Sequence, residues 1–197
     1  MQSPELAVAL TGASGAPYGL ALIRALAAAG RRVHVVVSGG GARVLREECD
    51  VSLNPKAPDP RLLAPETPDR LVVHSVEDYG ASIASGSYPL GGMAVCPCSM
   101  GTLGRIAAGT AENLITRAAD VCLKERRPLV LVAREAPLSA IHLENMLRLA
   151  RAGATILPAS PGFYHRPRTV DDLVRFVVAR AMEQLQVRQD LVPPWQG

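Results

Sequence analysis

Aromatic residues and long apolar runs are both scarce in this chain. Of its 197 residues, two are Phe, one is Trp and four are Tyr, which argues against a platform on which nucleic-acid bases stack. The net charge of +3, from 21 basic and 18 acidic residues, is too small and too scattered for a nucleic-acid-binding face. No uninterrupted apolar run reaches the roughly 20 residues that span a bilayer. The sequence therefore predicts a protein that binds neither nucleic acid nor a membrane.

Cysteine is also sparse, and its spacing does not indicate a metal site. The four cysteines are Cys49, Cys96, Cys98 and Cys122. The middle pair forms C-x-C inside an apolar run, not C-x-x-C, and no group of histidines completes the four ligands of a zinc site. We expect buried, reduced thiols, no metal, and a cytoplasmic protein.

Apolar residues, by contrast, make up 48% of the chain, and many lie in short runs that each lead into a turn and a helical stretch. Continuous apolar strands are typical of a parallel sheet that is buried on both faces. The repeated order predicts an α/β fold, a Rossmann-like (flavodoxin-like) doubly wound parallel sheet in three α/β/α layers. The expected strands are Leu6–Leu10, Arg32–Val37, Leu71–Val73, Met93–Pro97, Pro128–Val132 and Ala154–Pro158.

The length and the continuous pattern predict one domain over residues 1–197. Five prolines crowd the stretch at 50–70, which is expected to be an excursion over the surface because the strand pattern resumes directly after it. Residues 187–197 are expected to form a C-terminal tail. The expected helices are Leu20–Ala27, Ala42–Glu48, Glu112–Arg126, Ser139–Ala152 and Val170–Gln186.

The turn after the first strand, Thr11–Gly19, is the most informative stretch. A strand, a glycine-containing turn and a helix aim backbone N–H groups and a helix N-terminus at an anion. Gly12, Gly15 and Gly19 do not have the spacing of the dinucleotide motif, and no Walker-type motif is present. On pattern alone the stretch is therefore either an anion site or a tight turn whose glycines serve packing.

Further candidate loops follow the later strands. Cys98–Gly104 combines small residues with hydroxyls after the fourth strand, and Arg134 and Glu135 directly follow the fifth. The carboxyl ends of parallel strands share one edge of a sheet, where open α/β sheets bind ligands. The hydroxyl-rich stretch Asp78–Ser87 is interpreted as a ligand-facing loop, and His34, inside a strand, as a packed histidine.

Taken together, these stretches resemble the flavin prenyltransferases, the UbiX family, over nearly the whole chain. The combination is more diagnostic than any single part of it. The matching segments are Thr11–Ala16 with Tyr18–Gly19, Ala84–Ser87, Pro97–Ser99 with Gly101–Leu103, Thr116–Val121 with Leu123–Leu129, Arg134–Ser139, and Phe163–Pro167.

The resemblance implies a flavoprotein that transfers a dimethylallyl group from dimethylallyl phosphate to N5 of reduced FMN, with ring closure to C6. The product, prenylated FMN, would serve UbiD-type decarboxylases. No metal is implied. Members of the family form large homo-oligomers, dodecamers in known cases, and the resemblance extends that expectation to this chain.

The resemblance also implies roles for individual residues. Glu135 would protonate or position the departing phosphate, Glu48 would act as a general acid/base during ring closure, and Ser14 belongs to the same catalytic group. Tyr164 and Arg180 would reach a neighbouring subunit's site. The implied FMN-binding residues are Gly12, Ala13, Ser14, Ser38, Ser99, Met100, Gly101, Thr102 and Arg134, and the implied donor-binding residues are Ser85, Arg117, Lys124, Tyr164 and Arg180.

Simpler interpretations remain open from the residues alone. Glu48 and Arg180 are typical solvated helix charges, Lys124 suits a surface salt bridge, and Tyr164 could pack a loop. One departure from the family, Gly39–Gly41 in place of a Ser-Lys-Ala-Ala-like run, predicts a looser helix after the second strand.

Two other functions also remain open. A flavin-dependent cysteine decarboxylase would use oxidised FMN and a histidine, for which His74 is the candidate. A non-catalytic FMN carrier would need the flavin site but not Lys124, Glu135, Tyr164 and Arg180 together.

Overall fold

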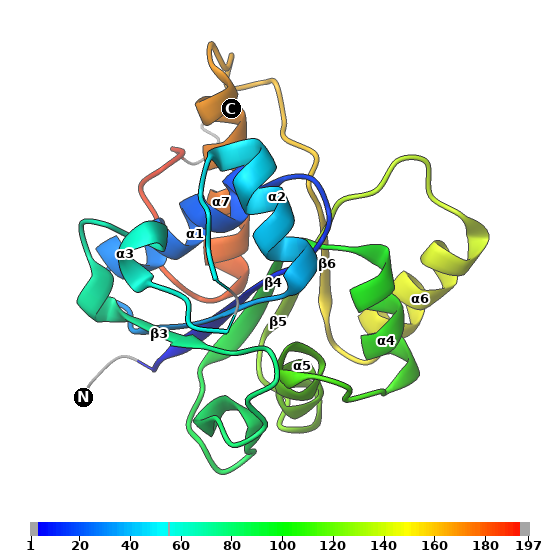
Figure 1. Cartoon of the computed structure of the whole chain (residues 1–197). Coiled ribbons are helices and arrows are strands. Elements are labelled where there is room, and N and C mark those ends of the chain that lie inside the picture. Colours follow the sequence, from blue (N-terminus) through cyan, green and yellow to red (C-terminus); the bar gives the residue numbers. More distant parts are fainter. Residues whose placement is uncertain (1–3, 55, 194–197) are drawn as a thin grey trace.

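The computed structural model describes residues 4–54 and 56–193, and these form a six-stranded parallel sheet flanked by helices (Figure 1). The strand order is β3-β2-β1-β4-β5-β6, and every neighbouring pair is parallel. The strands are β1 Leu6–Leu10, β2 Val33–Val37, β3 Leu71–His74, β4 Gly92–Cys98, β5 Leu129–Ala133 and β6 Thr155–Pro158.

The predicted doubly wound sheet is confirmed, and each predicted strand agrees with the structure to within one residue at either end. Apolar runs define these strands well because four of them, β1, β2, β4 and β5, are buried along their whole length. The helices are α1 Ala16–Ala28, α2 Gly39–Cys49, α3 Pro60–Leu63, α4 Met100–Ala108, α5 Leu114–Lys124, α6 Ala140–Arg151 and α7 Val170–Gln184, with 3₁₀ turns η1 Pro68–Arg70 and η2 Ser82–Ala84.

Two apolar clusters, one on each face of the sheet, produce the three layers. Along β1, Leu6, Val8 and Leu10 belong to the first cluster, while Ala7 and Ala9 belong to the second. The first cluster packs against α1 and α7, and the second against α4 and α5 (Figure 1). The large residues face the α1–α7 side and the alanines face α4 and α5, so β1 is the centre of both cores.

The proline-rich excursion packs on the protein through Leu53, Leu63 and Ala64, which are buried in the first cluster. Its short helix α3 buries Leu63, and the Leu63 carbonyl accepts a hydrogen bond from Arg24 Nε on α1 at 2.9 Å. Among the described residues, no helix combines the length and the apolar character that crossing a bilayer requires. The predicted tail is described only as far as residue 193, so Trp195 lies outside the described residues.

Candidate functional site

The site begins at the switch point of the sheet, where the chain leaves the neighbouring strands β1 and β4 in opposite directions. Thr11, 1% exposed, directly follows β1. Its hydroxyl donates to the Pro97 carbonyl at 2.8 Å and accepts from the Ser99 backbone N–H at 2.8 Å. Thr11 therefore joins the loop after β1 to the loop after β4, a role that sequence reasoning missed; a threonine ending an otherwise apolar strand is the signal that could have revealed it.

Replacing Thr11 with valine should lower the free energy of unfolding by about 2 kcal/mol. Valine keeps the shape of the side chain but leaves the Ser99 N–H and the Pro97 carbonyl without this partner. Urea unfolding would measure the loss. Thr110→Val is the matched control, because the Thr110 hydroxyl bonds the Arg105 carbonyl at an exposed position; equal stability of the two variants would contradict the proposed role of Thr11.

Arg134 connects a third loop to the first. It follows β5, and its Nε donates to the Ser14 carbonyl at 3.0 Å. Its own backbone N–H donates to the Cys98 carbonyl at 3.4 Å. Within the described residues, the Nη groups of Arg134 form no hydrogen bond and so remain for a bound anion. Ser14, Ser99 and Arg134, which were expected to share one edge, are thus brought together.

The backbone of the segment after β2 packs directly against the backbone of the loop after β1. A Cβ on Gly12 would lie 3.1 Å from the Gly40 Cα, so no side chain fits between the two loops. Ser38 caps α2 by accepting from the Gly41 N–H at 3.0 Å. The expected looser helix is wrong: α2 begins at Gly39, and its glycines permit a close contact that larger residues would block.

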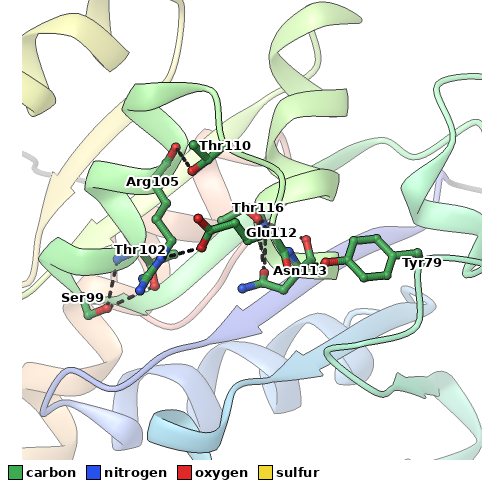
Figure 2. A network of polar contacts seen from close by, with 8 residues as sticks. All are labelled: Tyr79, Ser99, Thr102, Arg105, Thr110, Glu112, Asn113 and Thr116. Carbon is green, nitrogen blue, oxygen red and sulfur yellow. Dashed lines mark hydrogen bonds and ion pairs between the residues drawn. The ribbon is translucent and has the colours of Figure 1, made fainter.

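The fourth part of this edge is the start of α4, shown in Figure 2. Ser99 caps the helix by accepting from the Thr102 N–H at 3.3 Å and donates its own hydroxyl hydrogen to Thr102 Oγ1 at 3.1 Å. The Met100 side chain is only 7% exposed and lies in the core, so its backbone alone can contact a ligand. The first N–H groups of a helix have no intrahelical partner, which leaves those of Met100 and Gly101 for a ligand.

The same view shows how α4 is tied to the start of α5. Arg105 Nε on α4 donates to Glu112 Oε2 at 3.2 Å, and the Tyr79 hydroxyl donates to the Glu112 carbonyl. Tyr79 therefore anchors the loop after β3 to the α4–α5 connection, with its ring half-exposed at 53%.

Glu48 occupies the N-terminus of α1. One of its carboxylate oxygens accepts from the backbone N–H groups of Gly15 and Ala16, both at 2.8 Å. Burial acts to raise the pKa of Glu48, but these bonds, the Ser14 side chain and the nearby charge of Arg134 outweigh it and lower the pKa below its usual value. The anion at the first glycine turn is thus a carboxylate of the chain itself, which is held ionised beside Ser14.

Glu135 lies next to Arg134 in the loop after β5 and is exposed. Its carboxylate accepts from the N–H of the following residue, Ala136, at 3.1 Å. Among the described residues this is the one hydrogen bond of the carboxylate, so it can reorient toward a ligand without breaking a contact with another element.

Three expected donor-binding residues form a second group. Arg117 on α5 donates through Nε to the Ala84 carbonyl at 3.1 Å. Lys124, at the end of α5, contacts Glu125 at 2.5 Å. A Cβ on Gly86 would lie 2.6 Å from Lys124 Nζ, so the Ser85–Ser87 turn passes directly over the lysine.

One chain does not bring the two groups together. The flavin-side loops follow the carboxyl ends of the strands, whereas Ser85–Ser87 precedes β4 and Lys124 precedes β5, which places both at the amino ends. Tyr164 and Arg180 belong to neither group: Tyr164 packs on Phe176, and Arg180 pairs with Glu183 on α7. In Figure 1, loop 78–88 and segment 159–169 lie at opposite ends of the view.

The strand order and the loops gathered at the β1–β4 switch point define a protein of the class that binds a nucleotide-like cofactor at the carboxyl edge of its sheet. The family model described as Flavoprotein matches residues 1–182. The chain belongs to this family and, within it, to the UbiX flavin prenyltransferases: a relative with that name from Pseudomonas aeruginosa is 50% identical over 200 residues, which cover 99% of this chain and 96% of the relative.

Solved structures agree with this assignment. A crystal structure of AnUbiX (PadA1) in complex with FMN and dimethylallyl pyrophosphate has a TM-score of 0.90 and 40% identity, and the match covers 100% of this chain and 99% of that one. A dodecameric FMN-dependent UbiX-like decarboxylase from Escherichia coli O157:H7 has a TM-score of 0.87 and 46% identity, with 98% of this chain and 99% of that one covered. The family resemblance and the predicted fold are both confirmed.

Proposed function

We propose that this chain, acting as a single domain, is a flavin prenyltransferase that moves a dimethylallyl group from dimethylallyl phosphate to reduced FMN. The observation that carries the proposal is the joining of three strand-end loops by Thr11 and Arg134. Family members of the same name and a relative solved with FMN and dimethylallyl pyrophosphate support it.

FMN fits the carboxyl edge of the sheet. Gly12 and Gly40 meet through backbone atoms, and no side chain fits between them. The first N–H groups of α4 have no intrahelical acceptor, and the Nη groups of Arg134 are available for an anion. Bound reduced FMN would supply the nucleophilic ring that accepts the alkyl group. The residues proposed to hold it are Gly12, Ala13, Ser14, Ser38, Ser99, Met100 through its backbone, Gly101, Thr102 and Arg134.

The charged side chains would assist departure of the phosphate and removal of a proton. Lys124 and Arg117 would offset the negative charge that grows on the leaving phosphate as the C–O bond breaks. Glu135 would donate or hold the proton that this phosphate takes up. Glu48, held ionised by the α1 N-terminus, would accept the proton released during ring closure, and Ser14 would orient it.

The donor-binding residues would reach the flavin from a second copy of the chain. Within one chain, Ser85 and Lys124 lie at the edge of the sheet opposite Ser14 and Arg134, and Arg117 bonds the same loop as Ser85. A homo-oligomer, with Tyr164 and Arg180 also facing a neighbour's site, would bring these groups together. The dodecameric relative supports such an assembly for this chain.

The recipient of the product would be a UbiD-type decarboxylase, in keeping with the family. We propose the cytoplasm as the compartment, because four free cysteines are typical of a reducing environment.

The rival cysteine decarboxylase needs a histidine at the flavin. The candidate, His74, instead lies 2.8 Å from His34, nitrogen to nitrogen, in a mostly buried pair, which disfavours that reaction. The other rival, an FMN carrier, would bind FMN without changing it.

One experiment separates the three functions. The protein is incubated anaerobically with reduced FMN and dimethylallyl phosphate, and the flavin mass is measured. A gain of one five-carbon unit supports the prenyltransferase. Unchanged flavin refutes it; decarboxylation of a cysteine-ended peptide then supports the first rival, and stable FMN binding without either reaction supports the second.

A further inference from the structure

A hydrogen-bonded pair of histidines lies beneath the loop that carries Ser85. His34 on β2 is 3% exposed, and His74, the last residue of β3, has a side chain that is 11% exposed. Their rings are parallel to within 3°, with centroids 5.1 Å apart, and His34 Nδ1 lies 2.8 Å from His74 Nε2. None of the roles proposed above uses either ring.

The neighbours of the pair determine where its hydrogens lie. His34 Nε2 is 2.7 Å from a Glu5 carboxylate oxygen, which can only accept, so Nε2 carries a hydrogen. In a neutral His34, Nδ1 is then bare and accepts from His74 Nε2–H. Asp78 lies 3.9 Å from the remaining nitrogen of His74. With both rings neutral, the path from Glu5 through the two histidines is therefore fully hydrogen-bonded.

This network holds both ends of the donor-binding loop, residues 78–88. Asp78 at its start faces His74. Tyr88 at its end donates its hydroxyl hydrogen to Glu5, lies 3.2 Å from His34 Nε2 and contacts the Ser82 side chain. The other side of the loop is held by α5, where Arg127 donates to the Gly86 carbonyl at 2.7 Å and Arg117 to that of Ala84. The histidine network thus holds the two ends of the loop, and α5 holds its centre.

Protonation disturbs the pair. A proton added to His34 turns Nδ1 into a donor facing the hydrogen on His74 Nε2, so His74 must shift its hydrogen to the nitrogen that faces Asp78. A second proton would place two cations edge to edge in a buried site. The charges facing the pair are those of Glu5, Arg32 and Asp78, with the Tyr88 hydroxyl beside them. In a doubly charged pair, the N–H of His34 Nδ1 would face the N–H of His74 Nε2 across 2.8 Å, so the rings must separate, and this displaces Asp78 and the start of the loop.

We propose that the hydrogen-bonded pair of His34 and His74 positions the donor-binding loop, holding segment 78–88 in its binding shape only while both rings are neutral. The histidines are positioning residues, because they act through Asp78 and Tyr88 and not on the donor itself. The inference rests on the donor role proposed for Ser85. It predicts that acid weakens donor binding and leaves flavin binding unchanged.

The same pair makes folding stability depend on pH. Burial lowers the pKa of His34, against the opposing bond and charge of Glu5, and burial and the charge of His34 lower the pKa of His74. Because the unfolded histidines titrate near pH 6.5, this contribution to stability is complete above about pH 6.5 and is lost as the pH falls toward the lowered values. Urea unfolding from about pH 7.5 to 5.5 should show the loss in the wild type and a smaller one in His74→Gln.

The decisive measurement is the KM for dimethylallyl phosphate in wild type and His74→Gln. Glutamine can donate one hydrogen bond to His34 but does not titrate. From about pH 7.5 to 5.5 the wild-type KM should rise at least about fivefold more than the KM of the variant. The kcat and the FMN affinity should be the same in the two proteins at each pH. Ionisation of the donor phosphate affects both proteins equally. His142→Gln, which keeps a side chain suited to the capping box of α6, should follow the wild type. Matching profiles for wild type and His74→Gln would overturn the inference.

Hydrogen exchange tests the loop without any catalysis. The amides of Ala84 and Ser85, bonded to the Ala81 and Ser82 carbonyls, should lose protection at about pH 5.5 in the wild type and keep it in His74→Gln. A wild type that transfers no prenyl group at any pH refutes the proposed function alone, and this exchange measurement then decides the inference. Equal protection at both pH values would overturn it.

Discussion

Glu135→Gln should retain FMN and transfer the dimethylallyl group about 10²-fold to 10³-fold more slowly. The amide keeps the size of the side chain but cannot give a proton to the departing phosphate. Among the residues that the structure describes, the exposed carboxylate bonds only its own neighbour Ala136, so its replacement should leave the fold and the flavin-side loops unchanged. Single-turnover formation of prenylated flavin, followed under anaerobic conditions, measures the rate.

The control for Glu135 is Glu66→Gln, which changes an exposed carboxylate in the proline-rich segment. It should transfer the prenyl group at the wild-type rate. Loss of FMN binding by Glu135→Gln, with an undiminished rate in excess flavin, would show that Glu135 serves the cofactor and not the leaving group.

Gly41→Ala should destabilise the protein by about 3 kcal/mol, because the packing here leaves no room for a methyl group. A Cβ at Gly41 would contact the Leu10 carbonyl oxygen, lie 2.9 Å from the Leu10 carbonyl carbon and lie 3.2 Å from a Val37 methyl. Two of these neighbours are backbone atoms of the central strand, which cannot move without disturbing β1. Thermal and urea unfolding would measure the loss, and FMN affinity should fall as Gly40 is displaced from Gly12.

Gly39→Ala is the matched control in the same helical turn. Nothing lies within 4 Å of a Cβ at Gly39, and alanine is the better helix former, so this variant should be as stable as the wild type or slightly more so. If both alanine variants unfold alike, the close contact of α2 with β1 does not exist in solution.

The edge of the sheet that gathers Ser14, Ser99 and Arg134 could be predicted because each residue follows a recognisable buried strand. The partners of Glu48 could not be predicted in the same way. Glu48 is 33 residues from Gly15 in sequence, and as a charge at the end of a helix it resembles any solvated glutamate. Only the packing of α2 beside α1 brings its carboxylate to the first turn of α1.

The donor-binding residues show a second limit. Ser85 and Lys124 were expected to bind the donor, and family resemblance carries no information about which edge of one chain they occupy. Their position follows from where the loop before β4 and the end of α5 lie, at the amino ends of the strands. His34 and His74 are similar: the sequence predicts a packed histidine at His34, but the contact between the two rings depends on the register of β2 against β3.

The amino-acid sequence by itself determined the order of the strands, the parallel sheet and the turns at its carboxyl edge, because these follow from local apolar runs and glycines. Tertiary structure alone decided which distant groups meet: Glu48 at the start of α1, Arg134 on Ser14, and two histidines beneath a loop. Such contacts depend on how whole elements pack, and a pattern of neighbouring residues does not contain that information.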